Sequence, residues 1–302
     1  MEGILPINKA RGMTSHDVVF KLRKILHTKK IGHSGTLDPN VDGVLPVCIG
    51  AATKVVPYLM ASGKVYRGTV TLGFATETED LDGAEVTRTA LTQPFTDAQI
   101  MQGMEALTGD IEQIPPMYSA VKVNGRKLYE YARADETVAR PVRQIHVDYF
   151  KQTGPSTFDE QAGTQTIPFE IGCGKGTYVR TLSVQLGEQL NIPAVMSDLT
   201  RIKSGGFTLS QALTLEAVEQ AVADETINAK LLPIEYALAH YPMVDLTPDQ
   251  WQLVTNGGWL EPAVLGDADV VAVRFGGQVK ALYQRSADGK AAKPLKMFSN
   301  HL

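Results

Sequence analysis

One short segment of the chain combines residue types that could carry out chemistry. Residues 32–39 read GHSGTLDP and place the carboxylate of Asp38 between glycines and a proline, five residues after His33. Turns of this composition hold a side chain at a fixed angle on a protein surface. Residues 1–40 carry seven Lys and Arg against three acidic residues. A surface built for a polyanion normally excludes a carboxylate, so we expect Asp38 to have a chemical role.

A second glycine-rich segment, residues 172–177, lies between an expected strand and an expected helix. It is not a P-loop, because a glycine intervenes between its lysine and the following threonine. The first N–H groups of a helix can still bind an anion. We therefore expect this segment to hold a substrate phosphate or an active-site carboxylate, with Tyr178 and Arg180 in the first helical turn. The alternative is a tight turn followed by a solvated arginine.

Capping residues indicate where the helices begin. Thr14 with Asp17, and Thr96 with Gln99, have the spacing of a capping box, and Thr177 is the expected cap of a third helix. Together with the apolar spacing that follows, these signals predict helices over residues 14–26, 96–107, 178–190 and 215–223.

Strands and helices alternate irregularly along the chain. This order predicts an α+β fold with a mainly antiparallel sheet, and a cleft across the sheet in which residues 38, 66 and 178–180 meet. After residue 242 the pattern changes to short strands and glycine turns, which predicts a small β-rich module. The strands predicted before that module cover residues 44–49, 66–74, 144–150 and 167–173.

The segment 113–143 is too long for an ordinary connection. Prolines stand near both of its ends, and Tyr118, Tyr129 and Tyr131 lie among basic residues. Aromatic rings mixed with cations suit nucleic-acid contact, through stacking and phosphate pairing. A helical hairpin with an ordinary tyrosine core explains the same residues equally well.

Bulk composition limits the classes of function. The 302 residues have a net charge of −4, but the two basic segments, 1–40 and 117–143, favour selective contact with phosphates. Solvated helix faces would explain the same charges. No apolar run of about 20 residues and no signal peptide are present, so we expect a cytoplasmic protein without a membrane span. Two cysteines and six histidines show no metal-ligand spacing, and we expect neither metal nor cofactor.

Several motifs, in order, resemble those of the TruB family of bacterial tRNA pseudouridine-55 synthases. Residues 32–47 resemble the catalytic motif, 64–73 the tyrosine motif, 115–133 the RNA-gripping insertion and 174–188 the third motif, and Leu199 with Arg201 resembles the next. The resemblance covers nearly all of residues 3–240, and the tail resembles a PUA-related RNA-binding module less sharply. Ala10 and Thr200 depart from the family pattern, which commonly has proline and arginine there.

The resemblance implies two domains, a pseudouridine synthase domain over 1–240 with its insertion at about 113–143, and a PUA-like module over 241–302. It implies isomerisation of uridine to pseudouridine in the tRNA T-arm, by base flipping. It further implies that the enzyme is a monomer that needs no cofactor, metal or guide RNA. Uracil is detached at N1 and rejoined at C5.

The family's functional residues map onto matching positions. The resemblance implies that Asp38 is the nucleophile and that Arg180 is its ion-pair partner. Attack at C1′ and a glycal route both stay open. Tyr66 is implied to stack on the target base and is a candidate general base. The remaining contacts implied are Tyr178 and Leu199 to the uracil, His33 to the RNA where the base has left, and Lys9, Lys122, Arg126 and Lys127 to backbone phosphates.

Three other functions fit part of the pattern. An RNA-binding module would use Asp38 only as a turn residue, although phosphate binding alone needs no carboxylate. A guide-RNA-dependent relative of the dyskerin type would require a guide for activity. A nucleoside glycosidase would need a second catalytic acid and would release free uracil.

Overall fold

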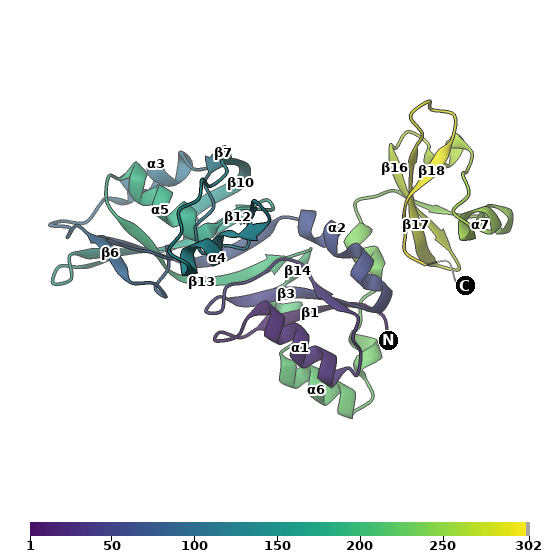
Figure 1. The fold of residues 1–302 in the computed structure, drawn as a ribbon, viewed down its shortest axis with the longest axis horizontal. Helices are drawn as coiled ribbons and strands as arrows, with labels where there is room; N and C mark the ends of the chain where they lie inside the picture. Colours follow the sequence, from purple (N-terminus) through teal and green to yellow (C-terminus); the bar gives the residue numbers. More distant parts are fainter. Residues whose placement is uncertain (300–302) are drawn as a thin grey trace. The chain divides into compact units, whose positions relative to one another are not determined.

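The computed structural model of the chain describes residues 1–299. These residues form two compact units (Figure 1). Unit 1 comprises residues 1–39, 44–60 and 205–299, and unit 2 comprises residues 40–43 and 61–204. Both units therefore combine segments that are distant in the sequence. The boundary expected at residue 240 stays a prediction, and residues 300–302 of the expected module lie outside the described part.

A mainly antiparallel sheet is the frame of unit 2. Five of its strands follow the order β13, β4, β12, β10, β7 with every neighbouring pair antiparallel, and β13 also pairs in parallel with Asp42 and Gly43. The strands predicted over 144–150 and 167–173 are confirmed as β10 and β12, and the α+β class is confirmed. The bounds are β4 (Lys64–Leu72), β7 (Gly109–Gln113), β10 (Arg143–Gln152), β11 (Thr157–Asp159, beside β12), β12 (Thr164–Cys173) and β13 (Ala194–Ser204).

Two helices pack against this sheet. Helix α3 (Asp97–Glu105) contacts β10, α5 (Val179–Gln189) contacts β13, and the two helices contact each other (Figure 1). The capping box predicted for Thr96 and Gln99 is confirmed. Along β12 the alternate residues Ile167, Phe169 and Ile171 are fully buried, as expected for a strand with one face in the core.

The strand predicted over 66–74 ends two residues early. Gly73 has φ of +115°, a backbone conformation that favours glycine, and its N–H bonds the carbonyl of Pro193 at 2.8 Å. The chain then enters a hairpin of β5 (Phe74–Thr76) and β6 (Glu85–Arg88). The alternation of residues 66–74 therefore predicted the strand correctly but missed its end.

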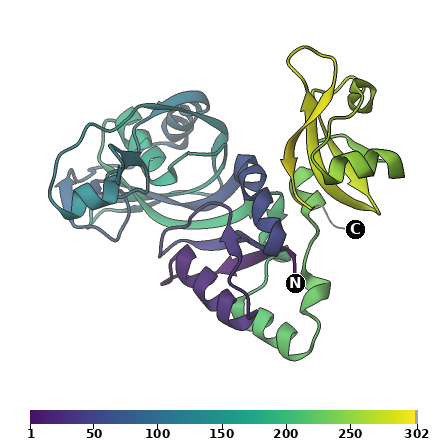
Figure 2. The ribbon, with the colours of Figure 1, turned by 45° about the vertical axis from the view of Figure 1, so that its right-hand side comes forward.

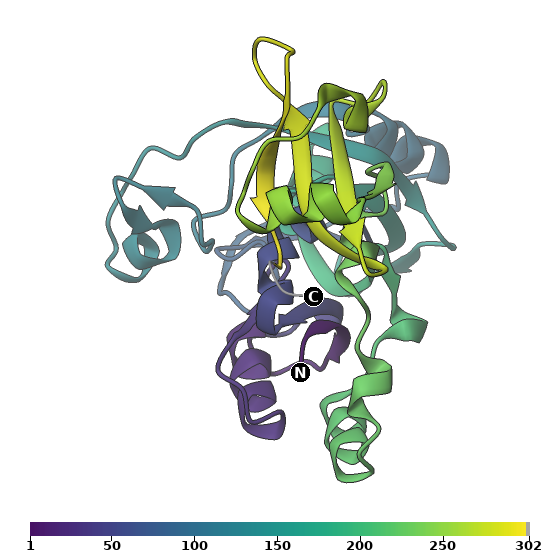
Figure 3. The same ribbon diagram turned by 90° about the vertical axis from the view of Figure 1, so that its right-hand side faces the viewer.

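The segment 113–143 forms a small strand hairpin followed by one short helix, not a helical hairpin. Figure 3 shows this insertion away from the sheet of its own unit. Asn124 and Gly125 make the turn with positive φ, as their sequence suggests. The elements are β8 (Lys122–Val123), β9 (Arg126–Lys127) and α4 (Leu128–Arg133).

Unit 1 begins with a strand and a capped helix. The predicted capping box of Thr14 and Asp17 is confirmed at the start of α1, and the predicted strand over 44–49 is confirmed within β3. Strand β2 pairs with β3 in antiparallel register. The elements are β1 (Gly3–Lys9), α1 (Ser15–Ile25), β2 (Ile31–His33), β3 (Asp42–Ile49), the 3₁₀ helix η1 (Gly50–Val55) and α2 (Val56–Ala61).

The rest of unit 1 contains a predicted helix and the predicted β-rich tail. Helix α6 (Leu215–Ala223) has the predicted bounds. The tail forms a four-stranded sheet in the order β15, β16, β17, β18, and the sequence pattern missed its helix α7 (Figure 2). The elements are β14 (Phe207–Thr208), η2 (Leu209–Gln211), η3 (Ile227–Lys230), η4 (Ile234–Leu238), β15 (Met243–Asp245), α7 (Pro248–Thr255), η5 (Pro262–Leu265), β16 (Val270–Phe275), β17 (Gln278–Arg285) and β18 (Ala292–Met297).

The core of unit 1 joins its early and late segments. Ile4 of β1 and Val44 of β3 belong to the same buried cluster as Ala272 of β16 and Leu282 of β17. A second cluster forms under α7, where Trp251 stacks on Phe275 with ring centroids 5.1 Å apart.

Close packing of β4 against β13 gives a testable prediction. A Cβ added at Gly68 would lie 2.1 Å from the carbonyl oxygen of Asp198, too close for any atom. We expect Gly68→Ala to lower the free energy of unfolding by about 2 kcal/mol or more. Urea unfolding measures this. Gly154→Ala is the matched control, because the nearest atom there is 3.6 Å away, and equal stabilities of the two variants would contradict the prediction.

Candidate active site

The loop that carries Asp38 connects β2 to β3 in unit 1 and is tied to its surroundings at several points. Ser34 N–H donates to the carbonyl of Pro46 at 2.9 Å, and Leu37 N–H donates to Ser15 Oγ at 2.9 Å. The carbonyl of Pro39 accepts from Gly12 N–H at 3.0 Å. Asp38 is half-buried between these ties. A short loop bonded on both sides of one residue leaves its carboxylate little freedom to move.

Lys9 is hydrogen-bonded to the same loop through the carbonyl of Pro39. Its side chain is fully buried, and its ammonium donates to the carbonyls of Ala10, Met13 and Pro39 at 3.0, 2.8 and 3.0 Å. An ammonium has three N–H donors, so three carbonyl acceptors match it. The sequence led us to expect Lys9 on the surface, in contact with an RNA phosphate. Its buried ammonium does not reach an RNA backbone, so that expectation is wrong. Ala10, which departs from the family pattern, contributes one of these carbonyls.

Tyr66 and Leu199 lie together on one face of the sheet of unit 2. Tyr66 in β4 is opposite Ile171 in β12 and Arg201 in β13. Leu199 is opposite Gly68, and its Cδ1 would be 3.1 Å from a Cβ at that glycine. Residues two apart on a strand share a face, so Leu199 lies beside the Tyr66 ring. Both side chains are more than nine-tenths buried.

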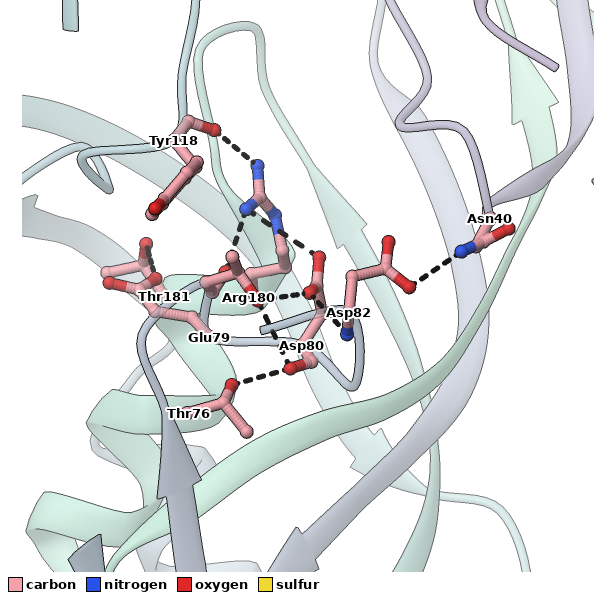
Figure 4. Close-up of polar contacts among 9 residues, drawn as sticks. Asn40, Thr76, Glu79, Asp80, Asp82, Tyr118, Arg180 and Thr181 are labelled. Atoms are coloured by element: carbon pink, nitrogen blue, oxygen red, sulfur yellow. Dashed lines mark hydrogen bonds and ion pairs between the residues drawn. The ribbon is translucent and has the colours of Figure 1, made fainter. Parts of the chain in front are cut away.

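Arg180 is a buried cation in the first turn of α5. Its guanidinium donates to the carbonyls of Thr78 at 2.8 Å and Tyr118 at 3.0 Å, and it is ion-paired with Asp80, with Nη1 and Oδ2 3.7 Å apart (Figure 4). Arg180 is 5% exposed. The solvated arginine considered from the sequence is therefore wrong. The guanidinium fixes a carbonyl of the insertion, Tyr118, to the helix start.

Asp80 is itself held in place. Its Oδ1 accepts from Thr78 Oγ1 at 2.5 Å and from the N–H of Asp82 at 3.1 Å, and its carbonyl accepts from Thr76 Oγ1 (Figure 4). Asp82 in turn accepts from the side chain of Asn40 at 2.6 Å. The sequence prediction treated residues 77–85 only as acidic excess and missed this role. A usable signal was the alternation of threonine and carboxylate over residues 76–80.

Glu79 is a second carboxylate beside Arg180. Its backbone has φ of +64°, which is uncommon for a residue other than glycine, and its Oε2 accepts from Thr181 Oγ1 at 2.6 Å. Burial raises the pKa of Glu79, whereas the Thr181 hydrogen bond and the Arg180 charge act in the opposite direction.

The expected Thr177 cap is wrong, and a distant glutamine takes its place. Helix α5 has Tyr178 as its N-cap, without a side-chain cap of its own. The buried Gln113 of β7 accepts from Tyr178 N–H at 2.7 Å and donates to the Tyr178 carbonyl at 3.1 Å. This pair of hydrogen bonds fixes the backbone of Tyr178. Because the partners are 65 positions apart, capping rules could not reveal it.

Some of the basic side chains of the insertion contact aromatic or acidic side chains of the same segment. Lys122 is exposed, Lys127 lies 5.2 Å from the Tyr129 ring centroid, and Arg126 lies 4.5 Å from that of Tyr131. Arg126 also pairs with Glu136 at 2.7 Å. Cation–π contacts of this length fix the direction of a long side chain.

The structure brings some of the expected site residues together and leaves others apart. Tyr66 with Leu199, and Arg180 with the carbonyl of Tyr118, meet inside unit 2. Lys9, His33 and Asp38 belong to unit 1. The ion pair of Asp38 with Arg180 and the cleft across the sheet therefore stay predictions. Thr200, the other departure from the family pattern, donates to Asp42 at 2.6 Å.

Over residues 1–299, no group of three or more His, Cys, Asp or Glu side chains is placed to hold a metal ion. In the part of the chain that the structure describes, no helix has both the length and the apolar character to cross a membrane.

Comparison with solved structures defines the class of protein. A chain of a crystallised Cbf5-Nop10-Gar1 complex matches 98% of this chain with a TM-score of 0.73 and 28% identity, and 85% of that chain is covered. A chain of an H/ACA RNP bound to a substrate RNA matches 98% with a TM-score of 0.71 and 26% identity, again over 85% of its length. The fold is that of the pseudouridine synthases.

Sequence comparison narrows the class to one family. The model of the TruB family pseudouridylate synthase N-terminal domain matches residues 23–179, and that of the tRNA pseudouridylate synthase B C-terminal domain matches residues 180–239. Proteins named tRNA pseudouridine synthase B are 63% identical in Levilactobacillus brevis and 55% identical in Lactiplantibacillus plantarum, over 99% of both chains in each case. The chain belongs to the TruB family of pseudouridylate synthases.

The buried ion pair gives a second prediction. We expect Asp80→Asn to lower the free energy of unfolding by about 3 kcal/mol, because Arg180 would keep a buried charge without its Asp80 counter-ion. Urea unfolding measures the change. Asp82→Asn is the control, since Asp82 is exposed and bonds a neutral side chain. An Asp80 variant as stable as the control would show that the Asp80–Arg180 ion pair does not stabilise the fold.

Proposed function

We propose that the chain converts the uridine at position 55, in the T-arm of tRNA, into pseudouridine. The family and the relatives named tRNA pseudouridine synthase B support this reaction. The N1–C1′ bond breaks, the uracil turns, and a C5–C1′ bond forms. The proton on C5 is lost and N1 gains one, so the change is neither an oxidation nor a reduction.

The fixed loop of Asp38 is the observation that carries the proposal. A carboxylate that attacks a sugar carbon, or assists loss of the base, must stay ionised and keep a constant position. The loop ties at Leu37 and Pro39 hold the residues on both sides of Asp38. In the proposal its ionised oxygen either attacks C1′ or helps to form a glycal.

Arg180 stabilises the ionised form of Asp38 in this proposal. An arginine offers a fixed positive charge and a planar fork of N–H donors that matches the geometry of a carboxylate. Asp80 then has a positioning role in the proposal, because it is ion-paired with the guanidinium proposed to pair with the nucleophile. The proposal needs an opposite charge within about 4–6 Å of Asp38 to favour the carboxylate.

The target base needs a pocket outside the RNA stack. Base flipping costs about a few kcal/mol, which stacking and apolar contacts must offset. Tyr66 offers a buried ring and Leu199 an apolar side chain beside it, and Tyr178 lies at a helix start that Gln113 fixes. An ordinary phenol has a pKa of about 10, so Tyr66 acts as a base only if its surroundings assist.

RNA outside the pocket meets the insertion. Lys122, Arg126 and Lys127 contact backbone phosphates in the proposal, and such contacts position RNA without reading its sequence. The substrate is a T-arm stem-loop, and no guide RNA takes part. The monomeric state and the cytoplasmic location expected from the sequence stay predictions.

Removing the nucleophile tests the chemistry. We expect Asp38→Asn to bind a T-arm hairpin within about twofold of the unaltered protein, since one carboxylate is lost and no RNA contact is removed. Tritium release from hairpin labelled at C5 of uridine should fall below detection. Glu219→Gln, on the exposed face of α6, is the control for a lost charge and should release tritium normally. Normal release by the Asp38 variant would reject the assignment.

The bare hairpin also separates this function from its nearest alternative. A guide-dependent enzyme would leave the hairpin unmodified without a guide, and a glycosidase would release free uracil. We expect pseudouridine as the product, with no free uracil in nucleoside analysis.

Shortening the insertion tests its role in binding. We expect replacement of residues 122–134 by a short Gly-Ser linker to weaken hairpin binding about tenfold or more, because several cations and two tyrosine rings are lost. This deletion keeps Tyr118, whose carbonyl holds Arg180. Fluorescence anisotropy measures the Kd, and circular dichroism checks that the sheet remains folded. An unchanged Kd would remove the gripping role.

A further inference from the structure

The basic residues within 1–40 do not form one continuous basic surface. Lys9 is buried under the Asp38 loop, so it does not contribute to a basic surface. The others in α1, Lys21, Arg23 and Lys24, are all exposed. Their directions around the helix decide what they can bind.

One exposed face of α1 carries a row of three side chains, which we call the α1 stripe: His16, Phe20 and Lys24. Residues four apart lie on one face of a helix, so the stripe runs along α1 for about 12 Å. Its position is opposite the buried residues Val18 and Leu22. All three members are exposed, and Phe20 is 57% exposed, which is unusual for a phenylalanine.

The members of the stripe contact one another and the Asp38 loop. Lys24 Nζ lies 4.4 Å from the centroid of the Phe20 ring. The His16 ring packs edge-on against His33, with centroids 5.7 Å apart. At the same end of the helix, Ser15 bonds Leu37, the residue before Asp38. The stripe therefore begins at the candidate active site and leads away from it.

The charges that flank the stripe on α1 differ. Asp17 and Lys21 lie roughly 100° and 140° around the helix from His16. Hydrogen bonds from Thr14 lower the pKa of Asp17, and Lys21 lowers it further. Lys21 also lowers the pKa of Glu216 in α6, after hydrogen bonds from the Glu216 backbone and Thr214. Lys21 thus has two acidic neighbours, Asp17 and Glu216, whereas Lys24 of the stripe lies over the Phe20 ring; His16, at the start of the stripe, also lowers the pKa of Asp17.

We propose that the α1 stripe is an RNA-binding surface for the part of the substrate that adjoins the flipped nucleotide. Lys24 contacts a backbone phosphate, the Phe20 ring packs on an exposed base or ribose, and His16 keeps the His33 ring in place. An exposed ring with a cation over it is the combination that single-stranded or looped RNA favours. The inference rests on the proposed function, because it takes a tRNA T-arm as the ligand.

The experiment measures hairpin affinity in the Asp38→Asn background, where no reaction occurs. We expect Phe20→Ala to raise the Kd about fivefold or more, and Phe20→Tyr to restore it, because the ring is what binds. Lys24→Ala should raise the Kd severalfold and reduce the slope of log Kd against log salt by about one. Fluorescence anisotropy at several salt concentrations gives both quantities.

Lys21→Ala is the matched control, since it removes the same charge from the same helix at a position outside the stripe, near Asp17 and Glu216. We expect its Kd and salt slope to stay close to those of the parent. Equal effects of Lys21→Ala and Lys24→Ala, or an unchanged Kd for Phe20→Ala, would overturn the inference. Pseudouridine formation by the protein with Asp38 intact is measured in parallel. If it forms pseudouridine while the stripe variants bind normally, only this inference fails; if it forms none, the proposed function fails.

Discussion

A positive charge that leaves water must be compensated, and the candidate site depends on this constraint in both units. In unit 1 the Lys9 ammonium is fully buried and donates hydrogen bonds to three carbonyls, one of them that of Pro39 beside Asp38. In unit 2 the Arg180 guanidinium is compensated by Asp80 and by two carbonyls. Each cation therefore fixes the conformation of loop backbone through the carbonyls that it bonds. The cost of leaving either charge unpaired keeps these loops in one conformation.

The sheet of unit 2 offers what the proposed function requires next, a rigid apolar surface for the base. Antiparallel pairing of β13 and β4 sets Leu199 over Gly68, beside Tyr66. A side chain at residue 68 would push β4 and β13 apart. The glycine therefore allows Leu199 to pack closely over β4. Sites on paired strands hold their geometry better than sites on loops, because every residue is bonded on two sides. In the proposed function, the other RNA contacts lie on the insertion and on an exposed face of α1.

The surfaces assigned to RNA share a common construction. In the insertion, Lys127 lies against Tyr129 and Arg126 against Tyr131, and in α1 Lys24 lies against Phe20. A ring under a cation limits the rotamers of the long side chain before any ligand arrives, which reduces the entropy lost on binding. The overall charge of −4 does not reveal this, because most of the acidic residues lie elsewhere in the chain.

The sequence by itself determined the local features and, through its motifs, the family. The capping boxes at Thr14 and Thr96, the bounds of α6 and the strand character of residues 44–49 depend on neighbours within a few positions, so periodicity and turn chemistry predict them. Only the tertiary structure decided the burial of Lys9, the Gln113 cap of α5 and the Asp80 partner of Arg180. Those contacts join residues up to about 100 positions apart, and local patterns carry no information about which distant groups meet in the fold.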